Sequence, residues 1–185
     1  MKTAKDILTF WFDRAGPKKW YQKSDSFDAL IRTEFEETAL QLAGDLSRGA
    51  PHDWEDDSDS HLALIIALDQ FPRNMYRGTQ AAFAWDTLAL NVAKRLVAKN
   101  HDLKISQDKR AFVYMPYMHS ENLIDQDDCV ALCDQRLDSQ STLHHAQEHR
   151  KVITQFGRFP HRNNTLKRVS TKEEMAFLKR GGYAP

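Results

Sequence analysis

Two segments of the chain place charged and amide side chains next to a Phe-Pro step. Residues 69–74 have the sequence DQFPRN, and residues 157–163 have the sequence GRFPHRN. Because proline lacks an amide hydrogen and clashes with the preceding helical turn, each step predicts a kink or an end of a helix. Arginine offers a planar fork of charged donors, and asparagine both donates and accepts hydrogen bonds. We therefore expect polar groups from both segments to converge on a pocket.

The first segment has two interpretations. Asp69 follows seven apolar residues, so we expect it to be buried and to need a cationic partner such as Arg73 or Arg77. In the structural interpretation, the side chains of Arg73 and Asn74 satisfy backbone carbonyls that the proline leaves free. In the functional interpretation, the arginines line a pocket and hold an anion such as a carboxylate or a phosphate.

A second group, His119, Ser120 and Glu121, follows Pro116 closely. Histidine is the most frequent general acid or base, and a nearby carboxylate can fix its tautomer. Adjacent residues on a helix diverge by about 100°, so these three side chains point together only if a bend at Pro116 reshapes the turn. The pattern favours capping or bracing of helices over chemistry. If there is chemistry, His119 and Glu121 are the candidate proton-transfer residues.

The third group surrounds the second Phe-Pro step. His145 and His149 are four residues apart, which is the spacing that lets two imidazoles bind one metal ion. The His-Glu-x-x-His pattern is absent, so neither a metal site nor a cofactor is predicted. Gly157 is expected to take a left-handed conformation where the helix ends. The candidate ligand-binding residues in the three groups are Arg73, Asn74, Arg77, His149, Arg158, His161, Arg162 and Asn163.

The elements that would position these residues are helices. Apolar residues recur at helical spacing, and no stretch alternates like a strand. We predict an all-α single domain, residues 1–185, of about eight antiparallel helices stacked in pairs. Residues 47–59 are expected to form a loop with an acidic, solvated run at 53–57, and residues 170–173 to form a capping box. The predicted helices cover roughly residues 3–15, 24–44, 61–71, 79–100, 106–119 with an interruption at Pro116, 122–137, 141–156 and 171–180.

Composition excludes several classes of function. The 26 Lys and Arg residues balance the 26 Asp and Glu residues, so no net field favours nucleic acid or an anionic membrane. No apolar run approaches the roughly 20 residues that span a bilayer, and the N-terminus lacks the pattern of a signal peptide. We expect a cytoplasmic protein. Cys129 and Cys133 lie four apart in a predicted helix, which suits buried thiols better than a disulfide.

Three strings of the sequence together resemble a known family. They are LDQFPRN at 68–74, MHSE at 118–121 and FGRFPHRN at 156–163. In this order the chain resembles the bacterial family called domain of unknown function 924. The resemblance implies an all-helical fold similar to tetratricopeptide-type stacks of helix pairs, and it brings no reaction, cofactor or catalytic residue. The chain departs from the family at 166–168, where Leu-Lys-Arg replaces Leu-Gly-Arg.

Two functions remain in competition. In the first, the protein binds a small anionic metabolite in an Arg- and His-lined pocket, with acid–base catalysis as an option. In the second, it is a helix-pair scaffold that binds a peptide or protein partner along a concave face, and the polar motifs only seal helix ends. The two differ in whether the arginines meet around a common hollow or are each paired locally.

Overall fold

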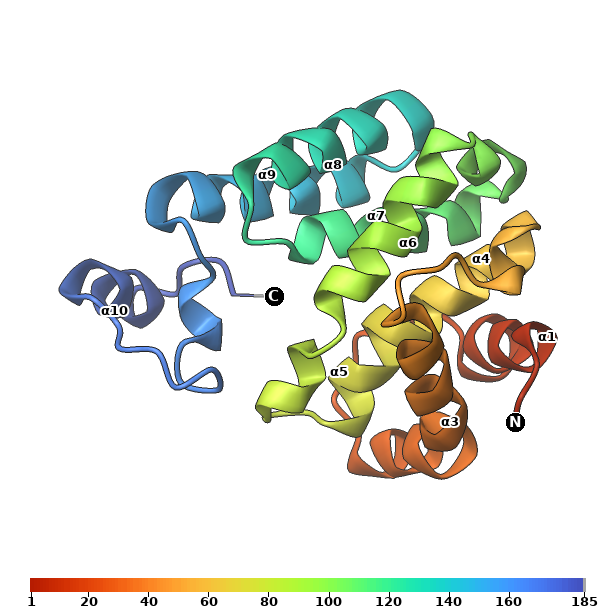
Figure 1. Ribbon diagram of the computed structural model, residues 1–185. Coiled ribbons are helices and arrows are strands. Elements are labelled where there is room, and N and C mark those ends of the chain that lie inside the picture. Colours follow the sequence, from red (N-terminus) through yellow and green to blue (C-terminus); the bar gives the residue numbers. More distant parts are fainter. Residues whose placement is uncertain (185) are drawn as a thin grey trace.

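The computed structural model describes residues 1–184 and, over that range, contains helices and no strands (Figure 1). All eight predicted helices are present, and a short additional helix, α2, lies between the first two. The first four are α1 (Ala4–Leu8) with the π-helical turn Thr9–Ala15, α3 (Asp25–Leu46), α4 (Ser58–Ile65) with α5 (Phe71–Met75), and α6 (Asp86–Ala98). The others are α7 (Gln107–His119), α8 (Leu123–Arg136), α9 (Gln140–Phe156) and α10 (Lys172–Lys179), and α2 covers Pro17–Trp20.

The central apolar run forms one continuous helical segment. α4 passes into a π-helical turn, Ile66–Gln70, and then directly into α5. The Phe71-Pro72 step therefore does not end the helix. Of the two predicted outcomes, the π-helical turn before it corresponds to a local distortion rather than a stop. The side chains of Arg73 and Asn74 donate to the carbonyl oxygens of Asp69 (2.7 Å) and Gln70 (3.0 Å), as the structural interpretation predicted.

α7 also runs through its proline. Pro116 lies inside the helix, which continues to His119, so the predicted interruption is wrong. Gln126 of α8 stabilises the end of this helix, because its amide nitrogen donates to the carbonyl oxygens of Tyr117, Met118 and Ser120 at 3.2, 2.8 and 2.7 Å. Carbonyls that would otherwise lack a partner at a helix C-terminus are thereby satisfied. This arrangement fixes the position of His119.

The loop before α4 is less solvated than predicted. It contains a short 3₁₀ turn, Asp53–Glu55, and α4 starts at Ser58 after the cap Asp57. Glu55, expected in a solvated acidic run, is buried and accepts two hydrogen bonds from Arg95, at 2.6 and 2.8 Å. The bidentate partner on α6 compensates for the cost of burying the carboxylate.

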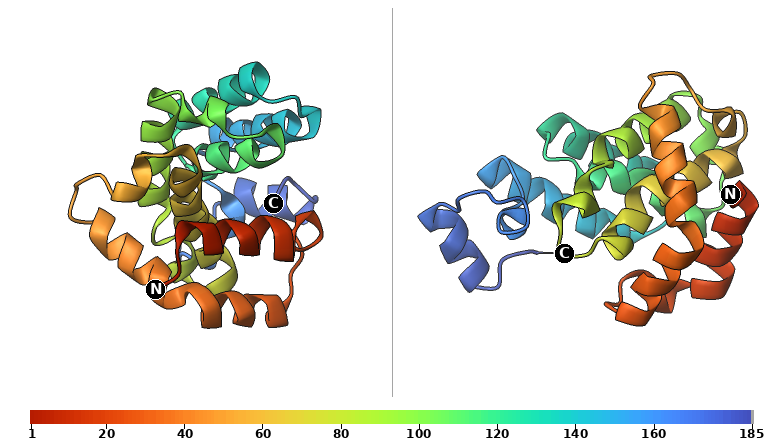
Figure 2. Two further views of the ribbon diagram at one scale, coloured as in Figure 1. Left: turned by 90° about the vertical axis from the view of Figure 1, so that its right-hand side faces the viewer. Right: turned by 60° about the horizontal axis from the view of Figure 1, so that its bottom comes forward.

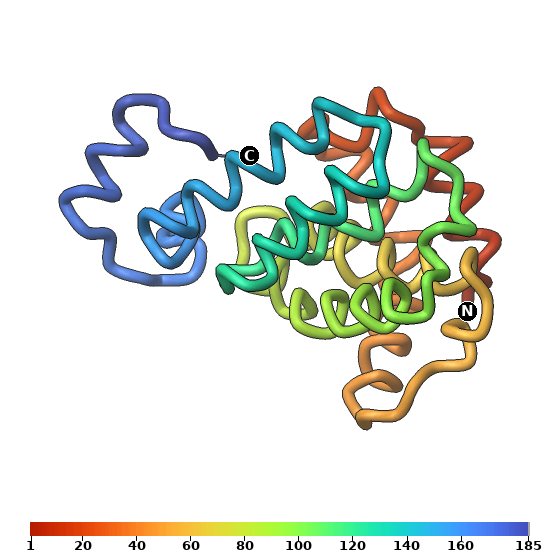
Figure 3. Tube along the Cα trace, turned by 90° about the horizontal axis from the view of Figure 1, so that it is seen from above, coloured from red at the N-terminus to blue at the C-terminus, as the bar shows by residue number. Residues whose placement is uncertain are grey.

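The helices enclose one main core and a smaller second one. Residues 62–68 of the central segment are fully buried in the main core, to which α1, α3, α6, α7 and α8 contribute. Consecutive helices α6 to α9 run alternately in opposite directions (Figures 1 and 3). The segment after α9, which we call the C-terminal segment (residues 157–184), lies beside the other helices (Figure 2). It packs on the end of α9 through Val152, Ile153, Phe156, Phe159, Phe177 and Tyr183.

A left-handed residue shapes the C-terminal segment. α9 ends as predicted at Gly157, with φ of 68°. Lys167 takes φ of 54°, a conformation that costs an L-residue free energy. The capping box of α10 is formed by Thr171 and Glu174, one residue later than predicted. These turns bring Arg168 back toward the other helices.

Replacing Lys167 by glycine should relieve this strain. Left-handed backbone costs an L-residue about 1–2 kcal/mol, and the greater freedom of glycine in the unfolded chain offsets about half of the gain. We expect Lys167→Gly to raise the free energy of unfolding by about 0.5–1 kcal/mol, measured by denaturant titration. The control Lys172→Gly alters an exposed residue of α10 and should lower the free energy of unfolding. A lower free energy of unfolding for Lys167→Gly would show that Lys167 is not strained.

Candidate functional site

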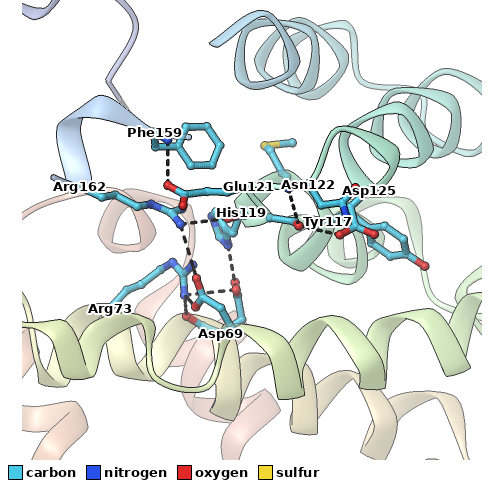
Figure 4. Close-up of polar contacts among 12 residues, drawn as sticks. Asp69, Arg73, Tyr117, His119, Glu121, Asn122, Asp125, Phe159 and Arg162 are labelled. Carbon is cyan, nitrogen blue, oxygen red and sulfur yellow. Dashed lines mark hydrogen bonds and ion pairs between the residues drawn. The ribbon is translucent and has the colours of Figure 1, made fainter. Parts of the chain in front are cut away.

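Side chains from five parts of the chain meet where the C-terminal segment faces the other helices (Figure 4). Asp69 and Arg73 come from the central helical segment, and His119 is the last residue of α7. Further members come from the start of α6, the middle of α9 and the turn that follows α9. We call the group the junction cluster, and its members are Asp69, Arg73, Asp86, His119, His149, Phe159 and Arg162.

Asp69 is the buried centre of the cluster. Its side chain is 0% exposed, Nδ1 of His119 lies 2.8 Å from one of its oxygens, and Nη1 of Arg73 lies 3.3 Å from the same oxygen. Gln70 donates to the other oxygen at 2.6 Å. Burial by itself raises the pKa of Asp69, but Arg73 and His119 outweigh it and hold the pKa well below its usual value. The carboxylate is therefore ionised.

The ionised carboxylate determines the tautomer of His119. Because it can only accept a hydrogen bond, Nδ1 of His119 carries the proton and Nε2 carries the lone pair. Nε2 makes no hydrogen bond with any residue in the range 1–184, and the side chain is 17% exposed. Burial and the neighbouring Arg73 lower the pKa of His119 despite the opposing effect of Asp69. A neutral imidazole with a free, oriented Nε2 can act as a general base.

Arg73 is paired with two carboxylates. Its guanidinium forms a bidentate pair with Asp86, at 2.9 and 3.0 Å, in addition to its contacts with Asp69. Asp86 is the first residue of α6, so this pair joins α5 to α6. The role of Arg73 is to keep Asp69 ionised and to fix the two helices.

Arg162 differs from Arg73 because its guanidinium is only partly paired. Nη1 donates to the carbonyl oxygen of His119 at 3.0 Å and lies 3.6 Å from Asp86. Phe83 and Phe159 contact the guanidinium, with ring centroids 4.8 and 4.5 Å from its central carbon. The side chain is 8% exposed, its Nε is buried without a partner, and Nη2 donates to no residue within 1–184. Burial lowers the pKa of Arg162 to about 10, so it stays charged at neutral pH.

His149 provides a second free imidazole nitrogen. On α9, Ala146, His149 and Ile153 are buried at helical spacing, which turns the His149 ring inward. Nδ1 lies 2.8 Å from the carbonyl oxygen of His145, an acceptor, so Nδ1 is the protonated nitrogen and Nε2 has the lone pair. The ring centroid lies 6.5 Å from that of His119. Burial lowers the pKa of His149 to about 3.

His161 borders the cluster rather than belonging to it. Its ring centroid lies 5.6 Å from that of Phe159, and its Nδ1 is buried without a hydrogen bond. Burial and the nearby Arg162 lower its pKa to about 4. The structure thus brings together four of the predicted residues and places a fifth beside them: Arg73, His119, His149 and Arg162, with His161.

Glu121, predicted as a proton-transfer residue, holds the C-terminal segment. It accepts a hydrogen bond from the backbone N–H of Phe159 at 2.8 Å and a bidentate pair from Arg168 at 2.6 and 3.0 Å. Burial raises its pKa, but Arg168 and the Phe159 amide outweigh this and leave the pKa lowered. Glu121 is therefore a paired carboxylate, which suits positioning better than proton transfer.

The remaining candidates are paired away from the cluster. Arg77 forms a bidentate pair with Asp28 at 2.6 and 2.9 Å, and Asn74 donates to a backbone carbonyl. Arg158 and Asn163 both donate to the buried Glu174. These residues organise α3, α5 and α10. The sequence did not predict Asp69 as the partner of His119, because the two residues are 50 positions apart. Glu121, two positions from His119, was the carboxylate expected to act with it.

Two surface hollows lie away from the cluster. One, of about 290 Å³, lies between α2 and α3, and the other, of about 320 Å³, adjoins the loop after α3. Among residues 1–184, no three His, Cys, Asp or Glu side chains are grouped so that they could hold a metal ion. Over the same residues, every helix is too short or too polar to cross a membrane.

These features define an all-helical protein with a buried carboxylate–imidazole pair beside an incompletely paired arginine. The chain belongs to the family of bacterial proteins of unknown function DUF924, whose model matches residues 7–182. A solved structure of a protein of unknown function from Agrobacterium tumefaciens is similar, with 39% sequence identity and a TM-score of 0.88 over 96% of this chain and 97% of that one. A comparison with curated proteins finds no match. The predicted family and the all-helical fold are confirmed.

Acid should destabilise the protein through its buried histidines. The pKa of His149 is lowered on folding to about 3, so the unfolded state binds the proton first. Stability is complete above the ordinary pKa of about 6.5 and declines below it by about 1.4 kcal/mol per pH unit. We expect a loss of about 2 kcal/mol between pH 6.5 and 5 from His149 alone, and His61 and His161, with pKa values of about 4, act in the same direction.

Denaturant titrations at pH 7.5, 6.0 and 5.0 measure this loss. The variant His149→Gln removes one titrating group and should flatten the dependence of stability on pH. His144→Gln changes an exposed residue of the same helix and serves as the control. Equal stability of the unsubstituted protein at pH 7.5 and 5.0 would show that the histidines are not buried as described.

Proposed function

We propose that the protein binds a small anionic metabolite at the junction cluster and that His119 exchanges a proton with this ligand. The observation that supports this proposal most is the state of Arg162. It is a buried cation whose Nε has no partner and whose Nη2 donates to no described residue. An unsatisfied buried donor costs about 1–3 kcal/mol. An anion with two acceptor oxygens would satisfy both donors in one contact.

The proton-transfer part of the proposal rests on the Asp69–His119 pair. Asp69 orients the imidazole through Nδ1 at 2.8 Å and would stabilise the imidazolium that forms when Nε2 accepts a proton. Arg73 keeps Asp69 ionised, so the proton stays on the imidazole. Arg162 donates to the carbonyl oxygen of His119, so an anion held by Arg162 lies close to this imidazole. The ligand would then present its hydroxyl, amine or other ionisable group to Nε2.

A thermal-shift screen against carboxylated and phosphorylated metabolites tests the binding. A ligand at 100 times its Kd adds about 2.7 kcal/mol to the stability of the folded state, which is a readily measured shift in Tm. Arg162→Lys keeps the charge but lacks the planar pair of donors. We expect this variant to bind the identified ligand at least about tenfold more weakly, equivalent to about 1.4 kcal/mol.

Arg77→Lys is the matched control. It makes the same substitution in an arginine that pairs with Asp28 outside the cluster, and its affinity for the ligand should be unchanged. If no compound shifts the Tm, or if both variants bind equally well, the arginines serve only to connect helices. The protein would then be a helix-pair scaffold for a peptide or protein partner.

A further inference from the structure

We propose that the ligand is a hydroxycarboxylate. In this proposal, the Nε and Nη2 edge of Arg162 holds a carboxylate, and a hydroxyl group of the same ligand donates to the free Nε2 of His119 or His149. The inference rests on the proposed function and specifies the chemical class that the same site accepts. Three independent features support it: the free edge of the guanidinium, the balance of charge in the cluster, and the two unpaired imidazole acceptors.

The free edge of Arg162 is the edge that other arginines of this chain use for carboxylates. Arg77, Arg95 and Arg158 each place Nε and Nη2 on the two oxygens of one carboxylate, at distances of 2.6 to 2.9 Å. In Arg162 the same two nitrogens donate to no described residue. The ring centroids of Phe83 and Phe159 lie 4.8 and 4.5 Å from its central carbon, and its Nε is itself buried, so a ligand reaches this edge only when a neighbouring side chain moves. A planar carboxylate matches two parallel N–H donors.

The charge of the cluster disfavours a dianion more strongly than a monoanion. Asp69 and Asp86 are balanced by Arg73 and Arg162, and the nearby Glu121 is balanced by Arg168. Low pKa values keep His149 and His161 uncharged at neutral pH. A phosphate dianion would add two negative charges close to Asp86, whereas a carboxylate adds one. Repulsion between like charges in a partly buried site therefore disfavours phosphate.

The imidazole nitrogens require a donor from the ligand. Nδ1 of His119 is bonded to Asp69, and Nδ1 of His149 is bonded to the carbonyl of His145. Each Nε2 therefore offers a lone pair, and neither accepts a hydrogen bond within residues 1–184. A simple carboxylate or the dianion of a phosphate monoester has only acceptors and cannot satisfy them. A hydroxyl group next to the carboxylate can donate to one of these nitrogens.

Matched pairs of small acids test this assignment. Lactate and glycerate carry a carboxylate with one or two hydroxyl groups, propionate lacks the hydroxyl, and methyl phosphate, whose dianion has no O–H group, represents the competing phosphate class. Dissociation constants are measured at pH 7.5 by NMR titration of the imidazole resonances. We expect lactate or glycerate to bind at least tenfold more tightly than propionate and methyl phosphate, and Arg162→Lys to weaken every carboxylate at least tenfold.

The hydroxyl preference has its own variants. His149→Phe and His119→Phe each remove one of the two acceptors, and at least one of them should abolish the tenfold preference for lactate over propionate. Binding of methyl phosphate or propionate as tight as that of lactate, with dependence on Arg162, would overturn the hydroxycarboxylate assignment and leave the proposed function intact. If none of the four probes binds the unsubstituted protein, the proposed function fails as well.

Discussion

The burial of one carboxylate constrains the arrangement of the whole cluster. Asp69 is removed from water in the middle of the central apolar helix, where an unpaired charge would cost several kcal/mol. The fold therefore has to bring it a cation and further donors. Arg73 comes from the next turn of the same segment, and His119 comes from the end of α7. Each of these partners is in turn fixed: Arg73 by Asp86 on α6, and the end of α7 by Gln126 on α8. One buried charge thus connects four helices.

The C-terminal segment joins this network from the opposite side. Glu121 and Arg168 form the ion pair that anchors it, and the Phe159 amide donates to the same carboxylate. This anchoring positions Arg162 so that it donates a hydrogen bond to the carbonyl oxygen of His119. The apolar packing that holds the C-terminal segment is local, because Phe159 packs in the small second core at the end of α9. The position of Arg162 is therefore determined by polar contacts on one side and by aromatic packing on the other.

The sequence predicted the helices well, because apolar periodicity and caps act locally. It also predicted the burial of Asp69 and its pairing with Arg73, which are four residues apart on one helix face. It failed at Pro116, where the helix is uninterrupted, and at Pro72 the helix does not end but passes through a π-helical turn. Proline removes one donor in each case, and the packing around these helices overrides that local cost. The partner of His119 could not be predicted, since contacts across 50 positions depend on the tertiary fold.

Pairing distinguishes Arg162 from the other predicted arginines of this protein. Arg73, Arg77 and Arg158 were predicted with Arg162 as one group, and they share its residue type and its position near a helix end. The first three have carboxylate partners that satisfy the guanidinium. Arg162 has carbonyl and aromatic contacts, but its Nε and Nη2 edge does not meet a carboxylate. A buried donor without a partner costs about 1–3 kcal/mol. A ligand with two acceptor oxygens would explain why this edge of Arg162 has no partner among the described residues.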